Sequence, residues 1–193
     1  MDEKQLIQKS MEGDSDAFSQ LVFLYEKRLV NFAYRMLGDS HEAEDAAQEA
    51  FLRAWKHMNT FRPDASFHTW LLAILNRICL DMLRKKQRTG EKKHVSLWQS
   101  SDGEEDYALQ IEDTAPGPDE VYRQKTAMQA VEEGMQELSE EHRNMILLRD
   151  VHGLEYDEIA KAIGVSLGTV KSRINRARIA LRKILEKNRE LFS

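Results

Sequence analysis

Apolar residues recur every three or four positions along stretches that proline and glycine rarely interrupt, and this feature most constrains the fold. The 193 residues include only three prolines and nine glycines. Such spacing marks the buried face of an α-helix, whereas a half-buried strand alternates apolar and polar residues. The sequence therefore predicts an all-α chain.

End signals divide the first part of the chain into three long helices. The first begins near Asp14 or Ser15, residue types that cap helices, and stops at Gly38, because glycine readily adopts the left-handed conformation. The second follows at once and runs to about Met58. The third opens at Ser66, after a turn-like segment, and ends in a basic run.

Residues 91–122 differ from both flanks. They hold nine acidic side chains against two lysines, with Pro116, Gly117 and Pro118 near their end. A segment so charged and so poor in periodic apolar residues cannot build a core. We interpret it as a flexible acidic linker between two small helical domains, residues 1–90 and 123–193.

The segment EYDEIAKAIGVSLGTVKSRINRAR, residues 155–178, has the pattern of a helix-turn-helix. Gly164 permits the turn and Ser166 is placed to cap the second helix. Small residues at Ala160 and Gly164 are expected to let the two helices cross closely. The second helix has one apolar stripe and a cationic opposite side, and such a helix lies in the major groove of DNA.

Residues 164–185 carry six Lys or Arg and no acid, although the net charge of the chain is −5. A charge run alone would favour a solvated helix face. Here it coincides with a turn, a cap and a matching first helix. This favours DNA, because neutralised phosphates release counterions and arginine can read guanine. Since an acidic protein is repelled by DNA, we expect weak binding alone and a larger carrier.

Residues 39–52 hold five acids and no Lys or Arg. Acids near a helix N-terminus are also favoured by the helix dipole, so a capped surface helix would explain part of the pattern. Leu52, however, falls within the acidic arc. An acidic face with an apolar residue in its middle suits docking to a basic helical surface.

Two blocks of the chain resemble a known family. AEDAAQEAFLRAWKHMNTFRPDASFHTWLLAILNRICLDMLRKKQR resembles region 2 of the extracytoplasmic-function (ECF) sigma factors, and LSEEHRNMILLRDVHGLEYDEIAKAIGVSLGTVKSRINRARIALRKIL resembles their region 4. The resemblance implies a subunit that binds RNA polymerase core and directs it to promoters with −10 and −35 elements. It also implies an anti-sigma partner.

The resemblance assigns residues to each partner. Those implied in docking on the coiled coil of the largest polymerase subunit are Asp45, Gln48, Glu49 and Phe51, and the acidic arc of the same helix adds Glu42 and Leu52. Region 4 would rest on the β-subunit flap. Its residues implied at the −35 element are Ser166, Gly168, Thr169, Lys171, Ser172, Asn175, Arg176 and Arg178.

The −10 element needs side chains that capture unstacked bases and track phosphates. The residues implied for it are Asn59, Phe61, Arg62, Asn76, Arg77, Arg84 and Lys85. Phe67 and Trp70 also flank this loop, but they fit the buried stripe and are assigned to the core. Many family members have Arg before Asn in this helix, whereas the order here is Asn76 then Arg77, which puts the usual −10 base preference in doubt.

Other classes of protein are less well supported. No two histidines lie three or four residues apart, and neither a phosphate-binding glycine loop nor a nucleophile elbow occurs. We therefore expect no enzyme, cofactor, metal or small-molecule substrate. The alternatives are a stand-alone helix-turn-helix regulator and a protein-interaction adaptor. The polar start and the lack of an apolar run of about 20 residues predict a cytoplasmic protein.

Overall fold

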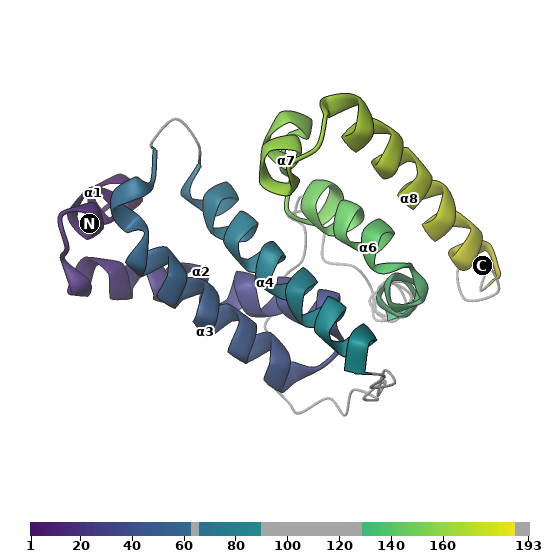
Figure 1. Ribbon diagram of the computed structural model, residues 1–193, viewed down its shortest axis with the longest axis horizontal. Coiled ribbons are helices and arrows are strands. Elements are labelled where there is room, and N and C mark those ends of the chain that lie inside the picture. The colour runs from purple at the N-terminus through teal and green to yellow at the C-terminus, as the bar shows by residue number, and fades with distance from the viewer. Residues whose placement is uncertain (63–65, 90–128, 188–193) are drawn as a thin grey trace, which may run out of the picture.

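The computed structural model describes residues 1–62, 66–89 and 129–187, and every regular element in these ranges is helical (Figure 1). The all-α prediction is confirmed. The linker predicted over 91–122 lies outside the described residues. The elements are α1 (Glu3–Met11), α2 (Ser15–Leu37), α3 (Ser40–Lys56), the 3-10 turn η1 (Met58–Thr60), α4 (Phe67–Thr89), a helix over 129–137, α6 (Glu140–Ile146), the π-helical turn η2 (Leu147–Val151), α7 (Tyr156–Ile163) and α8 (Leu167–Lys187).

The predicted ends of the long helices are confirmed. Asp14 caps α2 by accepting hydrogen bonds from the main-chain N–H groups of Asp16 and Ala17. Gly38 ends α2 with a φ of +77°. Ser66 Oγ accepts from the main-chain N–H of Thr69 at 3.0 Å, which starts α4. Each end is thus set by a local side chain or a local conformation.

The N-terminal bundle consists of α1 to α4. α2 contacts all three other helices, and α3 also packs on α4. α3 presents to this core a narrow stripe of fully buried alanines, namely Ala43, Ala47, Ala50 and Ala54. Because alanine is small, α3 approaches its neighbours closely. Ala46 and Phe51 are buried as well, and the remaining side chains of α3 are partly or fully exposed.

The C-terminal bundle consists of residues 129–187, in which α6 and α7 pack on α8. The helix over 129–137 meets the end of α8 at Gly134, where a Cβ would lie 3.1 Å from Leu185. The buried side of α8 is formed by Val170, Ile174 and Ala177. This packing leaves the opposite side of α8 facing outward.

The two bundles touch, and Arg143 joins them. α4 contacts α7 and α2 contacts α6, so the bundles lie side by side (Figure 1). The buried Arg143 guanidinium donates to the carbonyls of Met135 and Met36, at 2.9 and 3.0 Å. It therefore satisfies carbonyls at the C-terminal ends of two helices, where a cation is favoured.

Candidate functional site

The helix-turn-helix forms as expected, with one correction. α7 ends at Gly164 with a φ of +70°, and Ser166 Oγ accepts from the main-chain N–H of Thr169 at 3.2 Å to cap α8. A Cβ at Gly164 would meet nothing within 4 Å. The expectation that Gly164 allows a close helix crossing is therefore wrong, and this glycine serves only the left-handed turn.

The outward face of α8 is polar and cationic. Its exposed side chains in the first three turns include Lys171, Ser172, Asn175 and Arg176. Arg176 folds back on its own helix, with Nε donating to the Ser172 carbonyl at 3.3 Å and Nη2 to Ser172 Oγ at 3.4 Å. These weak, exposed bonds leave Arg176 able to turn toward a ligand.

Two other arginines of α8 are held by acids of the same bundle. Arg178 forms a two-pronged ion pair with Asp150 of η2, and the hydrogen bond to Asp150 raises the Arg178 pKa. Arg173 Nε lies 2.9 Å from a Glu141 oxygen. The basic face is therefore less cationic than the sequence of the helix suggests.

The acidic surface of α3 borders a shallow groove against α4. Asp45 and Gln48 are exposed, and Leu52 is 66% exposed despite being apolar. All three line the groove, together with Ile78 and Met82 of α4. Arg53 and Lys85 line the groove as well. The surface thus combines exposed acids of α3 with apolar side chains, as a surface for a basic amphipathic helix would.

The other residues implied in docking are engaged within the bundle. Glu49 pairs with Arg53 one turn along α3 at 2.7 Å, and Glu42 pairs with Lys86 of α4. Phe51 is buried. In this conformation Glu42 and Phe51 support the position of α3, whereas Asp45, Gln48 and Leu52 are exposed to solvent.

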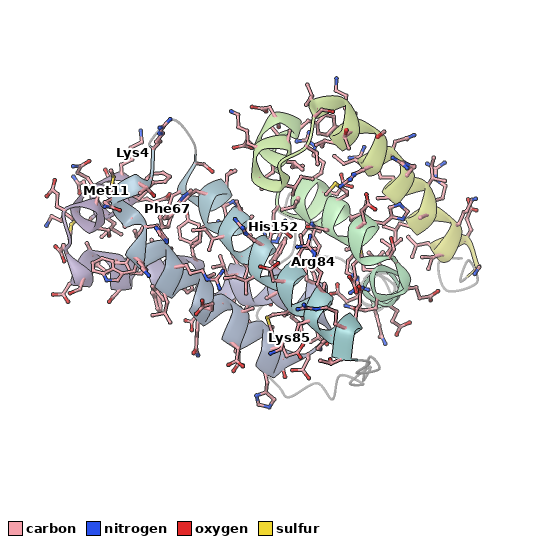
Figure 2. The ribbon with its side chains drawn as sticks, in the orientation of Figure 1. Lys4, Met11, Phe67, Arg84, Lys85 and His152 are labelled. Atoms are coloured by element: carbon pink, nitrogen blue, oxygen red, sulfur yellow. The ribbon has the colours of Figure 1, made fainter. Side chains whose placement is uncertain are left out.

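The residues implied at the −10 element also divide into buried and exposed ones. Phe61 is buried and packs against Phe67 and Trp70, with ring centroids 5.6 and 5.2 Å away. Asn76 is only 2% exposed, and its Oδ1 has no hydrogen-bond partner within the described residues. The exposed members are Asn59, Arg62, Arg77, Arg84 and Lys85. Figure 2 places the last two toward the end of α4.

Features of other protein classes do not emerge from the described residues. No group of three or more His, Cys, Asp or Glu in this part of the chain could hold a metal ion. Within the same residues, no helix has the length and apolar character to cross a membrane. Cys79 is buried, and burial raises its thiol pKa to about 12, so it is a packing residue rather than a nucleophile.

Comparison with known proteins identifies the family of the chain that carries these surfaces. Residues 21–89 match the family model for Sigma-70 region 2, and residues 128–181 match that for Sigma-70, region 4. The chain is 34% identical over 184 residues to the ECF RNA polymerase sigma factor SigW of Bacillus subtilis, covering 94% of this chain and 96% of the relative. The chain belongs to the ECF sigma factors.

Other similarities agree with this family. This chain is also 33% identical over 184 residues to the RNA polymerase sigma-H factor of Pseudomonas aeruginosa, and the match covers 95% of this chain and 94% of the relative. The sigma factor RpoE of Bartonella quintana, solved with the anti-sigma factor NepR, shares its fold with a TM-score of 0.63 at 25% identity, covering 88% and 96%.

Family membership settles the class of function. An ECF sigma factor binds RNA polymerase core and directs transcription initiation at specific promoters, and the family consists of initiation factors, not enzymes. The alternative of a stand-alone helix-turn-helix regulator is therefore not supported. The expectation of a sigma factor, drawn from the two sequence blocks, is confirmed.

Proposed function

We propose that this ECF sigma factor divides its work between two exposed surfaces of opposite charge, and this separation is the observation that carries the proposal. The acidic surface of α3 docks on polymerase core, and the basic face of α8 reads the −35 element. Each surface belongs to a different bundle, so both can be engaged at once when the bundles separate.

Docking on core uses Asp45, Gln48 and Leu52. Leu52 supplies apolar area, and Asp45 lines the same groove about two turns earlier on α3, where it can meet a cation of the largest-subunit coiled coil. Glu49 joins them if it exchanges its bond to Arg53 for one to the partner. Charge complementarity then selects the basic partner and speeds its encounter.

Reading of the −35 element uses the first turns of α8. The exposed side chains of Lys171, Asn175 and Arg176 reach base edges, while the main chain at Gly168 and Thr169 faces phosphates at the helix N-terminus. Arg178 contacts DNA only when a phosphate replaces Asp150 as its partner. The C-terminal bundle would also rest on the β-subunit flap.

The −10 element is recognised by α4 and the residues that precede it. Asn59, Arg62 and Arg77 offer exposed polar groups to unpaired bases, and Arg84 and Lys85 follow the duplex phosphates. Phe61 and Asn76 contribute through packing within the N-terminal bundle, since both are buried.

The cellular setting follows from the polymerase. We infer that the protein works in the cytoplasm, where bacterial RNA polymerase acts. The structural neighbour from Bartonella quintana was solved with an anti-sigma factor. By analogy, we infer that an anti-sigma factor also controls this chain by covering one or both surfaces.

A charge reversal on α3 tests the docking. Asp45→Lys should weaken binding to purified core at least about a hundredfold, because like charges at a docked interface cost several kcal/mol. Glu44→Lys is the matched control: it makes the same change on the neighbouring exposed residue, which does not line the groove. Equal loss in both variants, or none in Asp45→Lys, would contradict the docking assignment.

A further inference from the structure

Two histidines face each other where the bundles meet. The rings of His68 on α4 and His152, directly after η2, have centroids 5.6 Å apart. Tyr25 stacks on His68 at 5.9 Å, and Phe32 meets the His152 ring edge-on at 5.3 Å, and both belong to α2. Figure 2 shows His152 at the junction of the two bundles. The pair is therefore part of the interface between them.

Polar contacts around the rings fix the same arrangement. Thr69, next to His68, donates through Oγ1 to Glu158 Oε1 on α7 at 2.9 Å. Arg35 on α2 pairs with Glu132 at 2.9 Å. With the bond from Arg143 to the last turn of α2, these contacts hold the C-terminal bundle in one orientation.

The interface offers no hydrogen-bond acceptor for a proton on the second ring nitrogen of His68, as far as the described residues show. Its Nε2 is buried and has no hydrogen-bond partner among the described residues. A neutral ring can leave that nitrogen unprotonated, but an imidazolium donates from both nitrogens. Protonation would therefore bury an N–H group without an acceptor, which is costly.

The surrounding charges add to this cost. Those that face the two rings are Glu3 on α1, Arg28 and Arg35 on α2, and Glu158 on α7. Burial lowers the His152 pKa to about 4, with His68, Arg35 and Arg28 acting in the same direction. Burial and Arg28 also lower the His68 pKa, and the two glutamates oppose them without reversing the shift.

We propose that His68 and His152 form a proton-sensitive latch, which lets the bundles close when both rings are neutral and drives them apart when the rings are charged. The closed form is then fully stable above a pH of about 6.5, the ordinary histidine pKa, and loses stability as the pH falls below it. For His152 this continues down to the closed-form pKa of about 4. Within that window, each pH unit shifts the balance about tenfold toward the open form.

The latch matters for transcription because the closed form holds α7 on α4. Elements centred near −10 and −35 are about 25 base pairs apart, or about 85 Å along the duplex. Two bundles in contact cannot span that distance, so polymerase has to bind the open form. This consequence rests on the proposed function, whereas the latch itself is a property of the free protein.

Single-molecule Förster resonance energy transfer on the full chain, with one dye on each bundle, measures how far the two bundles open. Asn31→Cys on α2 and Glu186→Cys on α8 provide exposed attachment sites, and the buried Cys79 does not compete for dye. Measurement on single molecules avoids association near the sequence pI of about 5.7. We expect a closed population at pH 7.5 that opens at pH 5.5 while helix content, followed by circular dichroism, is unchanged.

Three variants distinguish the latch from general acid effects. His152→Lys carries a charge at all relevant pH values and should be open already at pH 7.5. The double variant His68→Phe, His152→Phe keeps two rings without titratable nitrogens and should stay closed at pH 5.5. His41→Phe removes an exposed histidine of α3 and should respond to pH as the wild type does.

Several outcomes would overturn the latch. They are a wild type that is open at pH 7.5 or stays closed at pH 5.5, a double phenylalanine variant that opens as much as the wild type, and opening that accompanies loss of helix content. None of these depends on polymerase binding, so the latch can fail while the proposed function stands.

Discussion

At the scale of single residues, the arginines of α8 differ in ways that the sequence of the helix does not reveal. Arg178 and Arg173 are held by Asp150 and Glu141, which lie 28 and 32 positions earlier in the chain. Helical periodicity places all these arginines on the surface, but it carries no information on partners from another element. We therefore propose Arg176 as the arginine that reads the −35 element, because it has no acidic partner in the described residues.

Arg176 gives the sharpest prediction at this scale. Arg176→Ala should lower discrimination between the cognate and a mutated −35 element by about 1–3 kcal/mol, the worth of a bidentate contact to a base. Competition binding of the reconstituted holoenzyme to the two promoters measures it. Arg182→Ala is the control, since it makes the same change on the exposed face of α8, further from the N-terminal turns that reach bases. Equal weakening on both promoters would instead make Arg176 a phosphate contact.

At the scale of elements, the ends of α2 and α3 and the starts of α4 and α8 could be predicted because each is set by its own caps and turns. Among the elements that the sequence analysis does not predict are α1 and η2. α1 precedes the first recognised apolar stripe and has only Leu6 and Ser10 buried. The π-helical turn η2 carries no cap or turn signal in the sequence, and it gives Asp150 its place beside Arg178. Local patterns thus predict the long helices but not the short α1 or the irregular turn that places Asp150 beside the basic face.

Gly164 tests the local account of the helix-turn-helix. Gly164→Ala should lower the free energy of unfolding by about 1–2 kcal/mol, because the left-handed conformation strains residues that have a Cβ. Gly164→Asn should cost less, since asparagine tolerates that conformation. Urea denaturation of the full chain compares the two. If both substitutions cost the same, space rather than φ limits this position, contrary to the open surroundings of its Cβ.

At the scale of the whole molecule, charge is distributed by segment. Residues 91–122 hold nine acids against two lysines, which more than accounts for the net charge of −5. Composition thus predicted two helical domains and poor intrinsic affinity for DNA. It could not predict that the bundles touch, because Arg143 and its acceptor Met36 lie 107 positions apart in the chain. The contact between domains arises from side chains that only the fold brings together.

In vitro transcription with purified core polymerase tests the central claim most directly. Core alone and core with this protein are given a genomic promoter library, and the 5′ ends of the transcripts are sequenced. The account predicts defined start sites that appear only when the protein is present, preceded by shared −10 and −35 sequences. Transcripts that are unchanged by the protein, while it binds a specific duplex tightly by itself, would contradict its assignment as a promoter-specificity subunit.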